Sequence, residues 1–242
     1  MDRTHVLGRN PRTAVIWAAL AGDLARGALE VVDAGGGTGG FAVPLAASGH
    51  RVTVVDPSTD ALAALTRRAA DAGVADRITP IQGDADRLAE FVPPGRCDLV
   101  LCHSVLELVD DPAGVAAALY AALRPGGAAS VLVANQHAAV LSRAMAGQLP
   151  AACALLAGPA GGTGPGERLR RRYTAESAQR LLAGAGLVVE QVHGVRVIAD
   201  LVSGAVAEHD PAALLAFELA AAGQPPYRDI ATGLHLYARR PA

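Results

Sequence analysis

Residues 29–57 read LEVVDAGGGTGGFAVPLAASGHRVTVVDP, and this stretch decides the fold. An apolar run ends in Asp33, the glycine-rich segment 35–40 follows, and a second apolar run ends in Asp56. Glycines let the backbone turn tightly and approach a ligand, and a helix that begins at Phe41 would point its N-terminal amides into the same crevice. The stretch therefore predicts a strand, a loop, a helix and a second parallel strand that together bind a nucleotide cofactor.

Two kinds of cofactor fit the glycines, because Gly35, Gly37 and Gly40 match the dinucleotide fingerprint as well as a loop that holds S-adenosylmethionine. Asp33 lies immediately before the loop, where a carboxylate suits an ammonium group better than a pyrophosphate. S-adenosyl-L-methionine carries such an ammonium group. Asp56 closes the next strand, where its carboxylate can accept hydrogen bonds from two ribose hydroxyls. These residues favour S-adenosylmethionine, with S-adenosyl-L-homocysteine as the product.

The segment VVDAGGGTG at 31–39 resembles the first motif of class I S-adenosylmethionine-dependent methyltransferases, and three later segments agree with that family. Asp84 lies in an acidic turn after a third apolar run, His103 follows a fourth, and the turn at 123–127 leads into a fifth. Continuous apolar strands also indicate a parallel sheet covered on both faces. The resemblance implies an α/β fold: a Rossmann-like, seven-stranded, mostly parallel sheet with helices on both faces, which is the class I methyltransferase architecture.

Apolar runs and turn residues place the elements of this fold along the chain. A helix is expected at about 12–26, ahead of the first strand, and further helices near 138–147 and 174–185. The expected strands lie near 29–33, 51–55, 78–82, 97–102, 128–134, 187–192 and 233–238.

The chain has 242 residues, of which 51% are hydrophobic and 18% charged, and chains of up to about 250 residues often form one domain. We expect a single methyltransferase domain over 1–242. It would comprise an N-terminal helical cap (1–27), a cofactor-binding half (28–135) and a substrate-side half (136–242). The segment rich in glycine and proline at about 158–167 is expected to be a flexible loop.

No apolar run approaches the roughly 20 residues that a membrane span needs, and the first four residues do not open a signal peptide. We therefore expect a cytoplasmic protein without a membrane partner. The three cysteines are odd in number and none makes a CxxC spacing, so neither a disulfide nor a metal site is expected.

The chain contains no lysine, so all 21 of its basic residues are arginines. This absence excludes several chemistries that require a lysine amine. Among them are a Tyr-xxx-Lys dehydrogenase site, a phosphate-binding P-loop and a Schiff base with pyridoxal phosphate.

Six short blocks recur in this order in one family: RTAVIW (12–17), HSVLE (103–107), NQH (135–137), MAG (145–147), GVRV (194–197) and GLHLYARRP (233–241). By these blocks the chain resembles the bacterial tRNA 5-carboxymethoxyuridine methyltransferases. Members of that family methylate the carboxylate of a modified wobble uridine to its methyl ester. The resemblance runs from about Gly8 to Pro241. The sequence differs from the family pattern just before the expected helix at 174–185, where this chain has arginines and the family has a lysine-rich stretch.

The residues assigned to cofactor binding are Arg12, Asp33, Gly35, Gly36, Gly37, Asp56, Pro57, Asp84, Ala85 and His103. The resemblance implies that Arg12 binds the cofactor carboxylate and that the three loop glycines line the methionine moiety. It further implies that Asp56 holds the ribose, that Asp84 and Ala85 flank the adenine, and that His103 lies against the cofactor.

The acceptor decides what catalysis requires. A carboxylate has a pKa near 4 and is already ionised at neutral pH, so it needs a cationic clamp and no general base. Arginine suits such a clamp because its fork is bidentate. We expect Arg196 to be the clamp, with Tyr173 and Arg172 as helpers. A hydroxyl acceptor would need a base, for which His103 is the candidate.

Two of these residues also have simpler interpretations. His103 could instead cap a helix that begins near Ser104, and Arg196 could pair with Asp200 or Glu190 on the surface.

Charge bears on whether the acceptor is RNA. The formal net charge of −2 argues mildly against an obligate nucleic-acid enzyme, but local charge matters more than the total. The arginines at 168–172, followed by Tyr173, could hold phosphates and stack a base of a single-stranded anticodon loop.

Three hypotheses for function stay open. The first is tRNA carboxyl methylation, and the second is a small-molecule O- or N-methyltransferase of secondary metabolism. The third is a non-catalytic S-adenosylmethionine-binding protein, although nothing in the sequence marks the glycine loop as degenerate.

Overall fold

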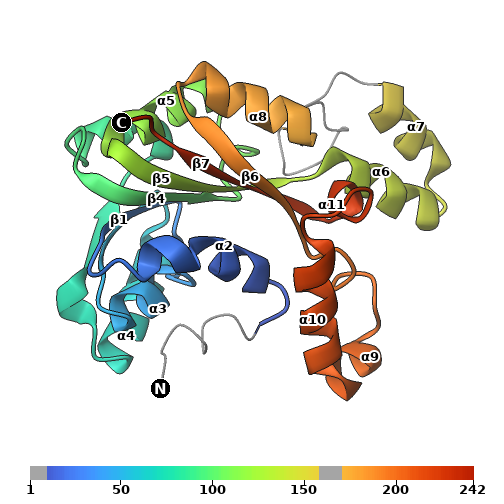
Figure 1. Ribbon diagram of the computed structural model, residues 1–242, viewed down its shortest axis with the longest axis horizontal. Coiled ribbons are helices and arrows are strands. Elements are labelled where there is room, and N and C mark those ends of the chain that lie inside the picture. Colours follow the sequence, from blue (N-terminus) through green and yellow to red (C-terminus); the bar gives the residue numbers. More distant parts are fainter. Residues whose placement is uncertain (1–9, 158–170) are drawn as a thin grey trace.

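A computed structural model describes residues 10–157 and 171–242 of the chain (Figure 1). Its centre is a seven-stranded sheet in the order β3-β2-β1-β4-β5-β7-β6. Strand β7 runs antiparallel to β5 and β6, and the other pairs are parallel. The sheet is therefore mostly parallel, which confirms the predicted fold class. The strands are β1 (Glu30–Ala34), β2 (Arg51–Asp56), β3 (Ile78–Gln82), β4 (Cys97–His103), β5 (Leu123–Ala134), β6 (Val188–Val195) and β7 (Gly233–Arg239).

The strand order reverses between β1 and β4. From β1 the chain builds outward through β2 to β3, and then returns to place β4 on the other side of β1. The register pairs Asp33 with Leu101 and Ala34 with Cys102, so the two strands end at the same edge. Connections that leave such a point in opposite directions open a crevice at the carboxyl ends of the strands, where α/β proteins bind their ligands.

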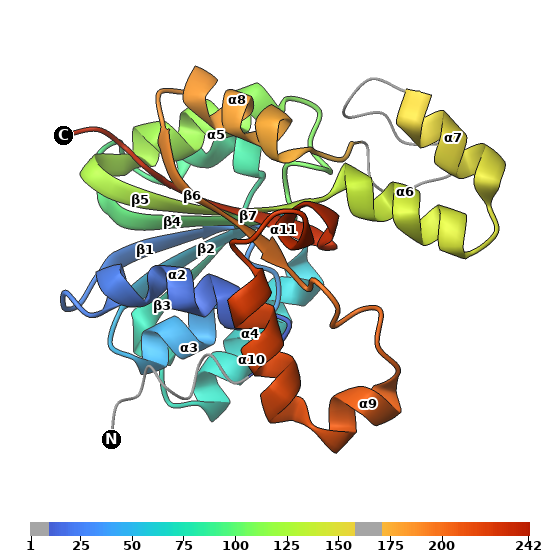
Figure 2. The ribbon, with the colours of Figure 1, turned by 45° about the vertical axis from the view of Figure 1, so that its right-hand side comes forward.

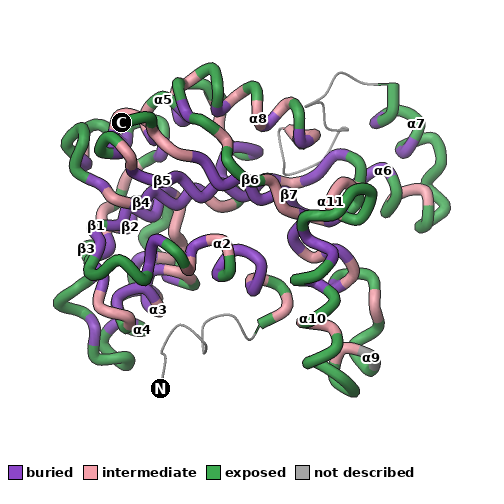
Figure 3. The backbone as a smooth tube through the Cα atoms, in the orientation of Figure 1, coloured by how far each residue is buried: buried purple, intermediate pink, exposed green. Residues whose placement is uncertain are grey.

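Helices cover both faces of the sheet, as Figures 1 and 2 show. Side chains alternate along each strand, so Val31 and Leu99 join one core whereas Val32 and Val100 join the other. Figure 3 shows the buried residues concentrated along the strands. The first face carries α2 (Ala14–Leu24), α3 (Ala42–Ala47) and α4 (Thr59–Asp71), and the second carries α5 (Pro112–Ala122), α8 (Ala175–Gly184) and the 3-10 helix η2 (Ala85–Glu90).

Local signals explain where several helices begin. Ser58 caps α4 by accepting a hydrogen bond from Ala61 N, and Asp111 caps α5. At α8, Thr174 and Ser177 form a reciprocal capping box.

The C-terminal half adds helices at one end of the sheet. Figure 2 shows α6 with α7, and α9 with α10, extending from that end on opposite sides. The additional helices are α6 (Gln136–Met145), α7 (Leu149–Ala157), α9 (Gly204–His209), α10 (Pro211–Ala221) and α11 (Tyr227–Ile230), and a further 3-10 helix is η1 (Ala75–Arg77).

The predicted elements exist, with shifted ends. The first helix covers Ala14–Leu24 within the expected 12–26, β5 begins at Leu123, and β6 continues to Val195. Residues 104–108 form a bend and a turn, so the possible helix start near Ser104 was wrong. Helices α7, α9, α10 and α11 were not predicted. The loop expected at 158–167 lies outside the described residues, as do the first nine residues of the expected helical cap.

Within 10–157 and 171–242, no helix is long and apolar enough to cross a membrane.

The packing of α4 against the glycine loop gives a test of the fold. Gly39 has a φ of +80°, and a Cβ there would lie 2.3 Å from Cδ1 of Leu65, whereas a Cβ at Gly40 would meet nothing within 4 Å. We expect Gly39→Ala to lower the free energy of unfolding by about 2–4 kcal/mol through strain and overpacking. Gly40→Ala is the matched control and should change it by less than about 1 kcal/mol. Urea unfolding measures both, and equal effects would contradict this packing.

Candidate active site

The glycine loop lies between the end of β1 and the start of α3, and its neighbours explain its glycines. Gly35 has a φ of +75°, and a Cβ there would lie 2.3 Å from Cγ2 of Val105. A Cβ at Gly36 would lie 2.6 Å from the Asp33 carboxyl and 2.9 Å from Cγ1 of Val54. Only glycine lets the loop turn here and lie this close to both strands.

Asp56 fixes the loop to the end of β2. Its Oδ2 accepts a hydrogen bond from Gly37 N at 2.8 Å, and its Oδ1 accepts one from Ser58 N at 2.9 Å. A carboxylate oxygen has two lone pairs, so each oxygen can accept one more hydrogen bond. A pair of neighbouring hydroxyls fits this remaining capacity.

A cavity of about 560 Å³ opens at the carboxyl edge of the sheet, and we call it the cofactor crevice. Carboxylates of Asp84, Asp86 and Asp110 join that of Asp56 in its lining, so its wall offers acceptors to hydroxyl and amino donors. The predicted cofactor residues that line it are Gly35, Asp56, Pro57, Asp84 and Ala85.

The other predicted cofactor residues lie differently. Gly36 and Gly37 belong to the loop, and Asp33 lies under Gly36. Arg12 is directed elsewhere, because its Nη1 pairs with Oδ1 of Asp200 at 2.7 Å.

Asp33 is buried, with 3% of its surface exposed. Its burial and, to a smaller extent, the negative charge of Asp56 together raise the pKa of the Asp33 carboxyl from 3.8 to about 7. An ammonium group beside Asp33 would offset both effects. The glycine loop therefore covers an acid that favours a cation as its neighbour.

His103 ends β4 beside the glycine loop. Its ring meets Phe41 edge-on, with centroids 4.6 Å apart, and Phe41 in turn stacks on Trp17 at 4.8 Å. Its Nε2 shares a hydrogen bond of 2.8 Å with Ser130 Oγ, whereas its Nδ1 is buried without a partner among the described residues. Burial lowers the pKa of His103 to about 4, so the ring is neutral at pH 7 and a weak base.

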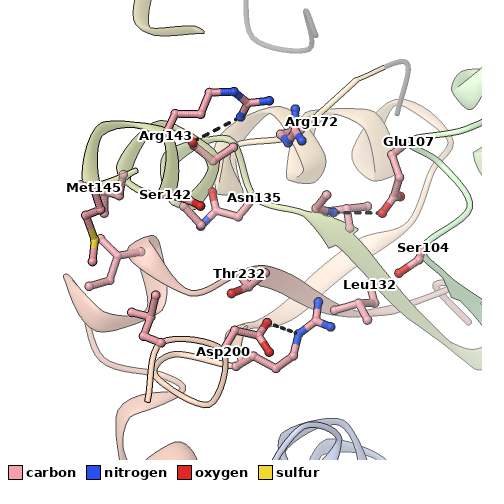
Figure 4. Close-up of a pocket in the computed structure, with 18 residues that line it drawn as sticks. Ser104, Glu107, Leu132, Asn135, Ser142, Arg143, Met145, Arg172, Asp200 and Thr232 are labelled. Atoms are coloured by element: carbon pink, nitrogen blue, oxygen red, sulfur yellow. Dashed lines mark hydrogen bonds and ion pairs between the residues drawn. The ribbon is translucent and has the colours of Figure 1, made fainter. Parts of the chain in front are cut away.

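A second cavity, of about 600 Å³, adjoins the crevice, and we call it the acceptor cavity (Figure 4). Ser104 lines both cavities, so they meet just after β4. Figure 4 shows Arg172 and Glu107 on one side and Asp200 on the opposite side. Arg196 also lines this cavity. Its wall thus brings together guanidinium and carboxylate groups from distant parts of the chain.

Two residues of the acceptor cavity have strained backbones. Ser104 (φ +59°) and Arg196 (φ +60°) are the non-glycine residues with positive φ in the described part of the chain. This conformation costs roughly 1–2 kcal/mol for a residue with a Cβ. Such strain persists only where the surroundings hold it, which is a feature of functional sites.

Glu218 on α10 holds the loop that carries Arg196. Its wholly buried carboxylate accepts hydrogen bonds from the backbone N–H groups of Val197, Ile198 and Ala199 at 2.8, 2.9 and 2.8 Å. Hydrogen bonds to a charged acceptor are among the stronger ones in proteins. They fix the backbone immediately after Arg196.

Asp200 joins two arginines at the edge of the acceptor cavity. Its Oδ2 lies 3.4 Å from Nε of Arg196, and its Oδ1 pairs with Arg12. The simpler interpretation of Arg196, pairing with Asp200, is thus confirmed, and the same side chain also lines the cavity.

Glu107 places a carboxyl in the acceptor cavity. Its Oε1 accepts a hydrogen bond from Ala134 N at 3.1 Å, and its Oε2 is buried without a hydrogen-bond partner among the described residues. Burial raises the pKa of Glu107, while its backbone hydrogen bonds and the charges of Arg196 and Arg172 oppose that rise.

The arginines at 168–172 do not share one environment. Arg168 and Arg170 lie outside the described residues. Arg171 donates to Leu106 O at 3.1 Å and to Asp110 O at 3.2 Å, so it braces the turn after β4. Arg172 lines the acceptor cavity.

Tyr173 was expected to help the clamp, and the structure places its ring in the core. It is 6% exposed, and its hydroxyl donates to Leu106 O at 3.1 Å. It is not among the residues that line either cavity.

Sequence reasoning did not find the anchoring role of Glu218. The signal was present, since Glu218 is the only charged residue within the apolar helix Pro211–Ala221. Glu107 entered the sequence analysis only as the last residue of the block HSVLE, and Asp200 only as a surface partner of Arg196.

Among the residues that the structure describes, no group of three or more His, Cys, Asp or Glu side chains could hold a metal ion.

Asp33 predicts how stability depends on pH. Its pKa is higher in the folded chain, so the folded state binds the proton more tightly, and the free energy of unfolding should fall as pH rises from about 4 to about 7. We expect Asp33→Asn to be more stable than the parent by a few kcal/mol at pH 8, with a smaller difference at pH 5. Urea unfolding of both proteins without cofactor at several pH values measures this. A difference that does not change with pH would contradict the burial argument.

Comparison with known proteins identifies the family. The sequence pattern of a methyltransferase domain family matches residues 31–127. The chain is 32% identical over 239 residues to the tRNA 5-carboxymethoxyuridine methyltransferase of Escherichia coli K12, covering 95% of this chain and 88% of that one. It is also 39% identical over 101 residues to a ubiquinone biosynthesis O-methyltransferase of Methylocella silvestris, covering 41% of this chain and 37% of that one.

The fold agrees with these similarities. A solved S-adenosylmethionine-dependent methyltransferase from Mesorhizobium loti superposes with a TM-score of 0.62 at 22% identity, over 94% of this chain and 98% of that one. Five of the ten predicted cofactor residues line the crevice at the carboxyl edge of the sheet. The protein is an S-adenosylmethionine-dependent methyltransferase of class I and belongs to the family of the bacterial tRNA 5-carboxymethoxyuridine methyltransferase.

Proposed function

We propose that this enzyme methylates the carboxylate of 5-carboxymethoxyuridine at the wobble position of tRNA, in the cytoplasm. The observation that carries this proposal is the similarity to the Escherichia coli enzyme along nearly the whole chain. The acceptor cavity supports it, because Arg172 and Arg196 place two guanidinium groups where a carboxylate could be held.

The cofactor crevice fits S-adenosylmethionine by the chemistry of its donors and acceptors. We propose that Asp33 takes the ammonium group, that Asp56 accepts from the ribose hydroxyls, and that Asp84 and Ala85 flank the adenine. When bound, the cofactor supplies a methyl group on a sulfonium. The chain supplies position, since transfer by in-line displacement depends on alignment and on exclusion of water.

A carboxylate acceptor needs no general base from the protein. It is ionised at neutral pH, so neither His103 nor Glu107 needs to remove a proton. The protein must instead hold the two oxygens and direct one of them at the methyl group. The backbone anchor at Glu218 and the ion pair with Asp200 hold Arg196 ready for this task.

The first test uses the purified enzyme, labelled S-adenosylmethionine and tRNA that carries the free acid at the wobble position. We expect Arg196→Ala to lower kcat/KM by about 100-fold, because a charge-assisted bidentate contact is lost. Arg196→Lys should recover part of this loss, since it keeps the charge without the fork. Arg67→Ala removes an exposed arginine on α4 outside both cavities and should leave kcat/KM within about twofold.

Salt provides a second readout in the same assay. Binding of an RNA anion releases counterions, so the KM for tRNA should rise steeply with salt concentration. Absence of methyl transfer to this tRNA by the parent enzyme, while other acceptors react, would overturn the proposal. Full activity of Arg196→Ala would be consistent with the proposed substrate but would contradict the proposed role of Arg196 as its clamp.

One observation favours a second candidate, a small-molecule O- or N-methyltransferase. Glu107 presents a buried carboxyl oxygen without a hydrogen-bond partner among the described residues, in the acceptor cavity, where it could accept the proton of a hydroxyl or amine. This candidate predicts methyl transfer to a protic small molecule that is insensitive to salt and is lost in Glu107→Gln. Carboxyl methylation predicts instead that Glu107→Gln keeps most of its activity.

The proposed role of Asp33 predicts a pH-dependent affinity for the product S-adenosylhomocysteine, which carries the same ammonium group. Protonation below about pH 7 removes the negative charge that the ammonium needs, so the Kd should rise by up to about tenfold for each pH unit below that value. In Asp33→Asn the Kd at pH 8 should be about 10- to 100-fold higher and nearly independent of pH. Calorimetric titration measures both, and equal pH profiles would contradict this role.

A further inference from the structure

Three imidazoles and one hydroxyl form a continuous polar row through the sheet, and we call them the imidazole chain: His103 on β4, Ser130 on β5, His235 on β7 and His193 on β6. Ser130 Oγ lies 2.8 Å from Nε2 of His103 and 2.8 Å from Nε2 of His235. Nδ1 of His235 lies 3.4 Å from Nδ1 of His193. The row therefore crosses four neighbouring strands.

The middle of the chain is shielded from water. Ser130 and His235 are fully buried, whereas His103 and His193 at the two ends are half-buried. His193 lines a cavity of about 380 Å³ between α2, β6 and α10, which shares no lining residue with the cofactor crevice. Burial lowers the pKa of His103 and of His235, so both rings are neutral at pH 7.

Proton counting couples the tautomers of these rings. The Ser130 hydroxyl has one proton, is fully buried, and contacts only the two imidazole nitrogens among the described hydrogen bonds. A buried hydroxyl proton needs an acceptor, so one nitrogen accepts that proton and the other donates its own to Ser130 Oγ. The contact between His235 and His193 likewise needs one N–H and one lone pair. Only two arrangements of the protons give every contact one donor and one acceptor. In one the hydrogen bonds are donated from His103 toward His193, and in the other from His193 toward His103.

The ends of the chain select one order. Nδ1 of His103 is buried without a partner among the described residues, and a buried N–H without a partner is rarer than a bare acceptor. Nε2 of His193 belongs to a half-buried ring beside a cavity, where water can accept from an N–H. Donation thus runs from His103 through Ser130 and His235 to His193.

We propose that Ser130, His235 and His193 are positioning residues that hold His103 with its proton on Nε2, so that its Nδ1 offers a lone pair beside the glycine loop. Such a nitrogen can accept a hydrogen bond and cannot donate to an anion. His103 is not among the residues that line either cavity, so we expect it to act on cofactor binding through the glycine loop and Phe41, which its ring contacts. The inference depends on the chain being an S-adenosylmethionine-dependent enzyme and not on the identity of the acceptor.

Nitrogen-15 NMR of the histidine side chains tests this on the whole protein, because the ring nitrogens report directly which one carries the proton. At pH 7.5 we expect an alternating pattern: His103 protonated on Nε2, His235 on Nδ1 and His193 on Nε2. His50 is an internal reference with its proton on Nε2, because its Nδ1 accepts from Leu29 N at 3.2 Å. The opposite pattern, with His103 protonated on Nδ1, would overturn the proposal.

Ser130→Ala breaks the chain at its middle. We expect His103 to lose its single tautomer while His50 is unchanged, and the Kd for S-adenosylhomocysteine to rise about threefold or more. Ser48→Ala is the control, since it removes a hydroxyl outside the imidazole chain, a half-buried one that donates to Pro44 O at 3.0 Å in α3. An unchanged His103 tautomer in Ser130→Ala would refute the coupling. If that variant does not fold, His193→Ala at the half-buried end gives the same readout on His235.

Discussion

Burial of the Asp33 carboxyl, close to a second carboxyl group, governs the electrostatics of the cofactor site. Asp56 ends β2, and Asp33 lies one residue before the end of the neighbouring parallel strand β1, so the two groups lie near the same edge of the sheet. Burial, and to a smaller extent the negative charge of Asp56, raise the pKa of Asp33 to about 7. A cationic group beside Asp33 would offset both effects, which is why we propose that Asp33 takes the ammonium group of the cofactor.

The neighbouring cavity is lined by three arginines (Arg143, Arg172 and Arg196) and two acids (Glu107 and Asp200). This excess of basic side chains supports the proposal that the cavity takes an anionic acceptor. Ser104 lies where the two cavities meet and has a left-handed backbone. The two cavities thus adjoin just after β4, an arrangement that suits the proposed transfer of a methyl group from a sulfonium to a carboxylate.

The cofactor half was predictable because its signals are local. The glycine loop, Asp33 and Asp56 form one βαβ unit, in which spacing fixes position. The acceptor half was less predictable, since its geometry depends on long-range packing. The sequence Arg172-Tyr173 does not show whether the tyrosine ring faces the cavity or the core, and the ring of Tyr173 lies in the core. The anchor at Glu218 appears only once α10 is folded against the loop of Arg196.

Mass spectrometry of the wobble nucleosides in tRNA from cells with and without this gene shows whether the enzyme methylates 5-carboxymethoxyuridine. We predict that its loss removes the methyl ester of 5-carboxymethoxyuridine and that the free acid accumulates in its place. The parent gene should restore the ester. An unchanged nucleoside profile would contradict the account and direct the search to small-molecule acceptors, with the fold and the cofactor crevice unaffected.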